Sequence, residues 1–276
     1  MQLQVLHSTT YFYAEPARRV TQLLRVTPAS FNGQAVLDWR IDVDRDASLR
    51  EGRDGYGNVT HMLYVDSPIE SLAISVAGRV LTEDRAGIVQ GLPQDLPREV
   101  FLRATDLTAA GPAVQDLARW FAAAPGTEIV RLHGLAGRLY DGLRFDTEAT
   151  EVETGAEEAL AAGHGVCQDF THIFIAAARG AGTPARYVSG HLFRRDGAHF
   201  QEAGHAWAEA WVEDLGWVAF DPLNGIGTDD AYVRVACGLD YRGAAPIAGA
   251  RAGGGGERLA VEVRVSAAPA QGRGQQ

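Results

Sequence analysis

The spacing of apolar residues changes twice along the chain, and these changes constrain the fold more than any other feature. Over residues 3–81, short apolar runs alternate with turn residues, which is typical of small antiparallel β domains. Over residues 112–180 the apolar positions recur at helical spacing, and after residue 185 the period of two returns. The sequence predicts an α+β protein, with an N-terminal antiparallel β domain over residues 1–85 and a core over residues 100–265.

In the core, helices are expected to precede a sheet. We expect strands at residues 5–13, 20–26, 36–43, 59–65, 72–81, 185–193, 205–212, 217–221 and 259–265. We expect helices at residues 112–124, 129–143 and 167–180. Asp54 to Asn58, with the sequence Asp-Gly-Tyr-Gly-Asn, is expected to form a hairpin turn.

The composition limits the location and the partners. The chain has 276 residues, a formal net charge of −10 and no run rich in Lys or Arg, so it lacks the basic character that binds nucleic acid or anionic membranes. Its first residues lack the basic segment followed by an apolar stretch that is typical of a secretory signal peptide, and it has no run of about 18 apolar residues. We expect a cytoplasmic protein that binds neither nucleic acid nor membrane. Residues 266–276, rich in Ala, Pro, Gln and Gly, are expected to form a disordered tail.

The first candidate for chemistry is a cysteine. Cys167 and Cys237 are too few for a disulfide framework, and a reducing compartment leaves both thiols free. Cys167 precedes apolar residues at helical spacing, so it is expected at a helix N-terminus. The helix dipole favours a thiolate there by only about 0.3 to 1 kcal/mol, whereas an adjacent imidazolium activates a cysteine far more strongly. A lone cysteine is more often a core thiol, so the assignment of Cys167 as nucleophile depends on a histidine within reach.

A predicted hairpin supplies that histidine. The run from His205 to Val212 alternates as a strand does, a turn follows, and a second strand ends at Asp221 before Pro222. If Trp211 faces Trp217, His205 and Asp221 lie on one face and on a diagonal that their side chains can bridge. A slip of one residue would send them to opposite faces, so the hypothesis depends on this register.

Given that register, each residue has a chemical role. Neutral His205 takes the proton of the Cys167 thiol, and the resulting imidazolium stabilises the thiolate. Asp221 orients the ring of His205 and stabilises its charge. The backbone N–H of Cys167 is one expected donor to the oxyanion, and Gln168 and the indole of Trp207 are candidates for a second.

These residues lie in motifs that resemble the transglutaminase-like superfamily, in its bacterial branch with an N-terminal β domain. The resemblance rests on the motifs Gly165–Asp169 (GVCQD), Gly182–Gly190 (GTPARYVSG), His205–Trp207 (HAW) and Gly216–Pro222 (GWVAFDP). Upstream motifs that match are Phe145–Thr150, His7–Tyr11, Leu24–Pro28 and Asp54–Asn58. The resemblance implies a papain-like core, with a nucleophile helix packed on an antiparallel sheet, and an acyl-enzyme mechanism on a peptide or protein amide without a cofactor.

Some positions depart from the family pattern. Phe145 stands where tyrosine is usual, Thr171 where a small apolar residue is common, Leu223 where threonine is usual, and Leu239 where arginine often occurs. None belongs to the Cys-His-Asp set, so these departures concern substrate contacts rather than the chemistry.

The sequence also bears on a metal site, on two further residues and on a different class of protein. No Cys/His spacing fits a zinc site, so no metal is expected. We expect His172 to be a hydrogen-bonded core residue and Glu209 to be solvated or ion-paired. A catalytically inactive binding module is the alternative from another class, but such modules often lose one member of the triad. Within the enzyme hypothesis, attack by water gives an amidase or peptidase and attack by an amine gives a transglutaminase; the absence of a calcium-loop pattern favours hydrolysis.

Overall fold

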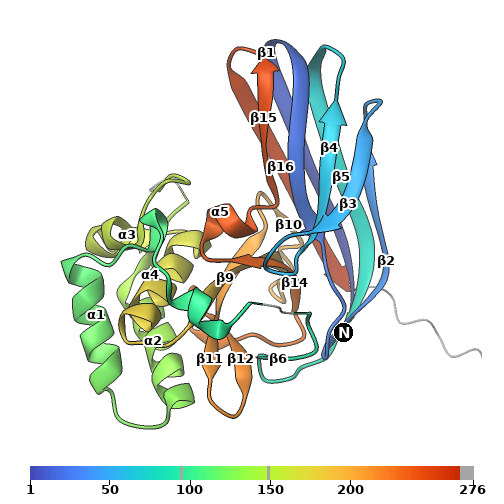
Figure 1. The fold of residues 1–276 in the computed structure, drawn as a ribbon. Coiled ribbons are helices and arrows are strands. Elements are labelled where there is room, and N and C mark those ends of the chain that lie inside the picture. Colours follow the sequence, from blue (N-terminus) through green and yellow to red (C-terminus); the bar gives the residue numbers. More distant parts are fainter. Residues whose placement is uncertain (94–95, 148–149, 268–276) are drawn as a thin grey trace, which may run out of the picture.

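The computed structural model describes residues 1–93, 96–147 and 150–267 of the chain. A tall antiparallel sheet stands beside a body in which helices cover a second sheet (Figure 1). The fold is the expected α+β fold, with a β-rich N-terminal region followed by helices and then strands.

The tall sheet is organised around one long strand, β1 (Gln2–Thr27). The first half of β1 lies between β5 (Ile69–Thr82) and β16 (Glu257–Ala267). Its second half lies between β4 (Val59–Val65) and β15 (Ile247–Gly253). The outer strands are β2 (Gln34–Val43), which pairs with β5, and β3 (Ser48–Arg53), which pairs with β4.

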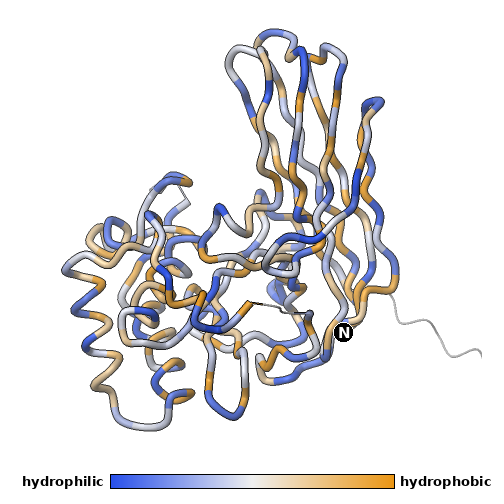
Figure 2. Tube along the Cα trace, viewed as in Figure 1, coloured by the Kyte–Doolittle hydropathy of each residue, from blue (hydrophilic) through white to orange (hydrophobic). Residues whose placement is uncertain are grey.

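The sequence predicted two strands where β1 is continuous. β1 passes through Pro16, which is exposed, and its pairing with β5 jumps from Phe12 to Ala17 at this point. Proline is tolerated there because a missing N–H costs little where the ladder is already interrupted. Buried and exposed residues alternate along β1, and Figure 2 shows hydrophilic and hydrophobic stretches alternating along the strands of this sheet.

The C-terminal strands correct the expected extent of the core. The sequence predicts residues 259–265 as a strand of the core, but they lie in β16, which pairs with β1 from Leu3 to Tyr13. Val263 and Val265 are buried there against Leu3 and Val5. A period of two in the sequence identifies a strand but not the strand with which it pairs, and β16 pairs with β1. Of the tail expected at 266–276, Ser266 and Ala267 belong to β16, and residues 268–276 lie outside the described part.

Three helices of the second body agree with the expected ranges: α1 (Pro112–Ala123), α2 (Glu128–Gly142) and α4 (Cys167–Gly180). Two shorter ones, α3 (Ala156–Ala162) and α5 (Tyr241–Ala244), were not expected. Two single-turn 3-10 helices, Arg98–Leu102 and Asp106–Thr108, precede α1. α4 lies at the centre, and Phe170, Ile173, Phe174 and Ala177 are all buried, as their spacing predicts.

The second sheet has the strand order β13-β12-β11-β9-β14, and β6 also pairs with β12. Its strands are β6 (Ile88–Val89), β9 (Ala185–Leu192), β11 (His205–Val212), β12 (Gly216–Asp221), β13 (Ile226–Gly227) and β14 (Tyr232–Gly238). Short strands elsewhere are β7 (Arg144–Phe145), which pairs with β8 (His164–Gly165), and β10 (Phe200–Gln201), which pairs with β16.

The two faces of this sheet have different partners. Ala206, Ala208 and Ala210 of β11 pack in one cluster with the buried residues of α4. Their small side chains let the helix lie close to the sheet. The opposite face carries Trp207 and Trp217, which pack with Phe101 and with residues of the N-terminal region. The alternation of β11 thus fixes which side chains meet the nucleophile helix.

Candidate active site

The helix α4 begins at Cys167, as the sequence predicts. Asp169, two residues further on, accepts hydrogen bonds from the backbone N–H of Val166 at 2.8 Å and from the hydroxyl of Thr150 at 2.7 Å. Gly165 leaves room for this carboxylate, since a Cβ there would lie 2.5 Å from Oδ2 of Asp169. The local sequence therefore fixes the first turn of α4 and presents Cys167 at a helix N-terminus, where unpaired backbone N–H groups point outward.

The hairpin has the register on which the hypothesis depends. Trp211 is paired with Trp217, and Ala208 with Phe220. His205 Nε2 and Asp221 Oδ2 lie 2.6 Å apart, so the predicted contact between these two side chains is confirmed. Both groups are buried, His205 with 8% exposure and Asp221 with none.

Asp221 is held by five hydrogen bonds. Besides His205, its oxygens accept from the backbone N–H of Leu223 (3.0 Å) and of Asn224 (3.2 Å), from Nδ2 of Asn224 (2.7 Å), and from the hydroxyl of Tyr232 (2.8 Å). Burial, the largest single influence, raises the pKa of Asp221, but the charge of His205 and these hydrogen bonds together lower it below its ordinary value. Asp221 is a carboxylate at neutral pH. Leu223 contributes through its backbone, so the usual threonine side chain is not needed for this contact.

The electrostatics of His205 favour an imidazolium. Burial has the largest single influence and lowers the pKa of His205, but the charge of Asp221, the hydrogen bond with it and the interaction with Cys167 raise the pKa to about 10. Because Nε2 faces Asp221, the interaction with Cys167 falls to the other ring nitrogen, Nδ1. The site thus stabilises a positively charged ring beside the sulfur, which is the condition that a nucleophilic cysteine requires.

Trp207 lies beneath the histidine on the same face of β11. Its ring centroid is 6.2 Å from that of His205 and 5.4 Å from that of Tyr232, and it is almost fully buried. A Cβ on Gly190 would come within 2.5 Å of this indole, so the glycine makes room for it. Trp207 therefore packs against two members of the site.

Gln168 follows Cys167 directly, and its side chain is almost buried. Its amide nitrogen donates a hydrogen bond to the carbonyl oxygen of Val152 at 3.0 Å. This hydrogen bond connects Val152, which precedes α3, to the first turn of α4. One amide N–H of Gln168 is thus engaged, and its role as an oxyanion donor stays a prediction that depends on the other.

The structure also defines the environments of Glu209 and His172. Glu209 is fully buried and ion-paired: its oxygens lie 2.6 Å from Nε of Arg186 and 2.7 Å from Nε of Arg234. Burial, the largest influence, raises the pKa of Glu209, but the two arginines together lower it to about 2. His172 accepts a hydrogen bond from the backbone N–H of Tyr241 at 3.1 Å, which confirms its prediction as a core residue.

Tyr232 and Asn224 were not identified from the sequence. Asn224 follows Asp221 within a turn that contains Pro222, and such Asx turns are a recognisable local signal. Tyr232 lies on another strand, and nothing in its own segment indicates a contact with Asp221.

Among residues 1–93, 96–147 and 150–267, no group of three or more His, Cys, Asp or Glu side chains is placed to hold a metal ion. No helix in the same ranges is long and apolar enough to cross a membrane.

A cysteine at the start of a helix, packed on an antiparallel sheet that carries the histidine and the acid, is the papain-like arrangement. Two family models match the chain: the transglutaminase-like superfamily over residues 115–222 and the bacterial transglutaminase-like N-terminal region over residues 3–81. The chain belongs to the transglutaminase-like superfamily, in the branch that carries this N-terminal region.

The chain is also similar to individual proteins. An uncharacterized protein of Mycobacterium tuberculosis is 31% identical, over 89% of this chain and 86% of its own length. One of Mycobacterium leprae is 29% identical, over 96% of this chain and 98% of its own length. The crystal structure of a protein from Cytophaga hutchinsonii, described as a candidate cysteine protease, has the same fold, with a TM-score of 0.77 and 21% identity over 96% of this chain and 90% of that one.

Proposed function

We propose that the chain is a cysteine enzyme that cleaves an amide bond of a peptide or protein through a thioester on Cys167, with water as the main acceptor. The observation that carries this proposal is the contact of His205 with Asp221 on one side and Cys167 on the other. All three side chains are partly or fully buried, which strengthens their mutual electrostatic interaction.

The first half of the reaction forms the acyl-enzyme. The Cys167 thiolate attacks the carbonyl carbon of the amide, and the backbone N–H of Cys167 donates to the developing oxyanion. The imidazolium of His205 then gives its proton to the leaving nitrogen, and the C–N bond breaks. An amine is released, and the acyl group remains on sulfur as a thioester. Gln168 and Trp207 are our candidates for a second oxyanion donor.

The second half returns the enzyme to its starting state. Neutral His205 accepts a proton from a water molecule as the oxygen attacks the thioester, and the carboxylic acid leaves as the C–S bond breaks. A primary amine can take the place of water, which gives a new amide and makes the protein a transglutaminase. Asp221 keeps the ring oriented in both halves.

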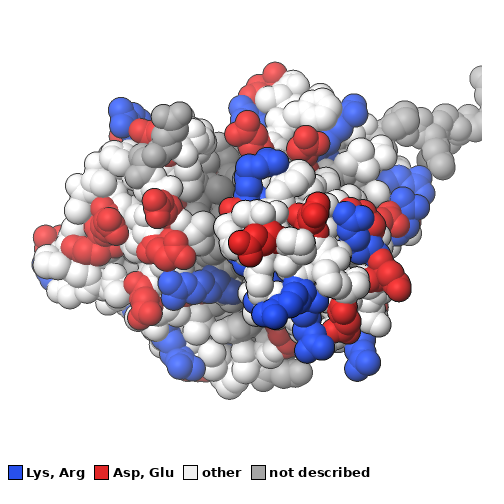
Figure 3. Space-filling model, turned by 90° about the horizontal axis from the view of Figure 1, so that it is seen from above, with Lys and Arg blue, Asp and Glu red and all other residues white. Residues whose placement is uncertain are grey.

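One feature of the composition makes the choice of acceptor easy to measure. All 25 basic residues are arginines, and the chain contains no lysine. On the face seen in Figure 3 these arginines lie among acidic side chains. A thioester on Cys167 therefore meets no lysine amine of its own chain. Any amine-transfer product on a lysine side chain in a purified reaction then comes from the substrate, and an adduct with the added amine has a mass of its own.

The test is a product analysis by mass spectrometry with a library of peptides, with and without a small primary amine. We expect hydrolysed peptide from the wild type and none from Cys167→Ala, while Cys237→Ala, at the other thiol, keeps the wild-type product pattern. Amine adducts in preference to acids would assign amine transfer instead. Peptide binding that is equal in the wild type and in Cys167→Ala, without any product, would contradict the enzyme proposal and favour a binding module.

A further inference from the structure

Two side-chain amides of the N-terminal region hold the free edge of β14. Among the strands that the structure describes, β14 is the last of its sheet, and it pairs there with β9 alone. Gln34 donates from Nε2 to the carbonyl of Arg234 at 2.9 Å and accepts from the N–H of Arg234 at 2.8 Å. Asn58 makes the same pair of bonds with Cys237, at 2.7 Å and 2.8 Å. Each amide thus makes the two backbone hydrogen bonds that a neighbouring strand would otherwise make with one residue of β14.

The backbone of β14 is shaped for these contacts. Residues of a regular strand face the same edge at a spacing of two, whereas Arg234 and Cys237 are three apart. The pairing with β9 shifts between Arg234 and Ala236, and the extra residue of this bulge brings both backbone groups to the same edge. The bulge and the two amides thus fit one another.

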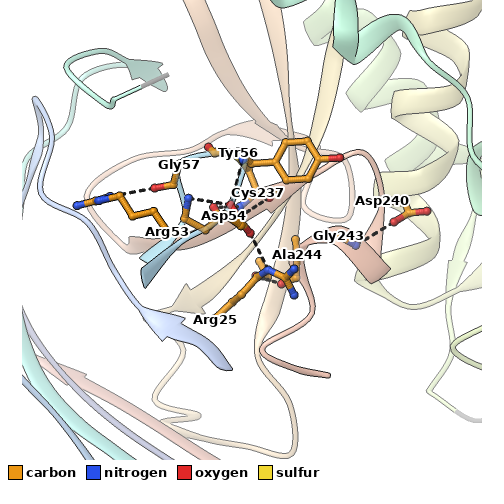
Figure 4. A network of polar contacts seen from close by, with 11 residues as sticks. Arg25, Arg53, Asp54, Tyr56, Gly57, Cys237, Asp240, Gly243 and Ala244 are labelled. Atoms are coloured by element: carbon orange, nitrogen blue, oxygen red, sulfur yellow. Dashed lines mark hydrogen bonds and ion pairs between the residues drawn. The ribbon is translucent and has the colours of Figure 1, made fainter. Parts of the chain in front are cut away.

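The turn that carries Asn58 is itself fixed. Oδ1 of Asp54 accepts from the backbone N–H of Tyr56 (3.0 Å) and of Asn58 (3.1 Å), and Oδ2 accepts from Nδ2 of Asn58 (3.0 Å). Arg25 of β1 pairs with the same carboxylate at 2.9 Å. Figure 4 shows Asp54, Tyr56 and Gly57 of this turn close to Cys237. Asn58 therefore reaches β14 from a rigid support.

β14 begins with the residue that contacts the acid of the candidate site. The hydroxyl of Tyr232 donates to Oδ2 of Asp221 at 2.8 Å, and only 7% of Tyr232 is exposed. Its ring lies 6.0 Å from that of His205. Burial first, and the charge of Asp221 second, raise the pKa of Tyr232 far above its ordinary value. Tyr232 is therefore a neutral phenol, and it can act on Asp221 only as a hydrogen-bond donor.

We propose that Tyr232 is a positioning residue for Asp221, and that Gln34 and Asn58 of the N-terminal region hold β14 where Tyr232 reaches that carboxylate. This rests on the proposed function, because it assigns Tyr232 to the same site. The charged or titratable groups around the contact are His205 on β11, Cys167 on α4 and Asp229, which precedes β14. The N-terminal region is then part of the catalytic machinery's support and not a separate module.

The test uses alkylation of Cys167 by iodoacetamide as a function of pH, followed by peptide mapping that separates Cys167 from the buried Cys237. This readout needs no substrate, so a failure of the proposed function, seen as no turnover of any amide, is distinguishable from a failure of this inference. Tyr232→Phe removes one of the donors that hold Asp221 in contact with His205, so the carboxylate is less well placed to stabilise the imidazolium. We expect the acid side of the alkylation profile to move up by about one pH unit. Tyr140→Phe, at an exposed position of α2, is the matched control and should leave the profile unchanged.

The contribution of the N-terminal region is tested by a double-mutant cycle. Gln34→Met removes the bonds to Arg234, and it should move the profile in the same direction as Tyr232→Phe. In the Tyr232→Phe background it should cause little further movement, because both act through one contact. Asn58→Leu serves the same purpose at Cys237 if Gln34→Met does not fold. A Tyr232→Phe profile that coincides with the wild type would overturn the role of Tyr232, and fully additive effects would overturn the role of Gln34 and Asn58.

Discussion

Replacing Asp221 by asparagine tests how much the carboxylate contributes to the charge of His205. The pKa of His205 is raised from 6.5 to about 10, and at about 1.36 kcal/mol per pKa unit this corresponds to about 5 kcal/mol in favour of the imidazolium. His205 is buried, so solvent screening reduces this value little. If Asp221 supplies only about half of it, its loss makes the thiolate–imidazolium pair about 100-fold less favourable.

The assay is the rate at which iodoacetamide alkylates Cys167 near pH 6.5. In Asp221→Asn, burial of His205 is no longer offset by a carboxylate, so we expect the rate to fall by about 100-fold. Cys237 in the same sample is a buried reference thiol. Asp214→Asn is a control that removes the same charge in the exposed turn of the same hairpin, where asparagine also tolerates the observed φ of 70°. An alkylation rate in Asp221→Asn within about twofold of the wild type would show that Asp221 does not determine the charge of His205.

Three further predictions concern stability and the helix start. Because the pKa of His205 is raised in the folded state, its stabilising contribution is complete below pH 6.5 and is lost as the pH rises through about 10. The difference in free energy of unfolding between wild type and His205→Gln should therefore shrink over that interval, and a constant difference would contradict the pKa. Glu209→Gln should lower the free energy of unfolding in denaturant by about 3 to 5 kcal/mol, because two buried arginines lose their carboxylate. Glu213→Gln, in an exposed pair with Arg98, should lower it by less than about 1 kcal/mol. Equal losses would contradict the larger contribution of the buried ion pairs. Gly165→Ala should lower both the Tm and the rate of Cys167 alkylation, because the added Cβ displaces Asp169. Gly134→Ala, with nothing within 4 Å of its Cβ, should stabilise α2 by about 1 kcal/mol. A higher Tm for Gly165→Ala than for Gly134→Ala would contradict both expectations.

The core of the site could be predicted because its determinants are local. The period-two run from His205 and the turn before Trp217 define a short hairpin, and the pairing of Trp211 with Trp217 follows from its length. Cys167 at the start of α4 follows from the apolar spacing after it and from the glycines that end the helix. The fold class follows from the two changes of period.

The contacts that were missed join residues far apart in sequence. Gln34 and Arg234 are separated by 200 positions, and Asn58 and Cys237 by 179. The return of β16 to β1 belongs to the same class. A strand pattern says which residues face inward, but it does not say which edge the strand will join. Tyr232 was missed for this reason, because its contact with Asp221 depends on where β14 lies.

In the proposed reaction Cys167 carries the acyl group. This is tested by the mass of the intact protein after rapid acid quenching of a reaction with a peptide that it cleaves. We predict a covalent acyl adduct on Cys167 that appears before the acid product and is absent from Cys167→Ala. Cleavage of the same peptide by Cys167→Ala at the wild-type rate, or an adduct located on Cys237, would contradict it.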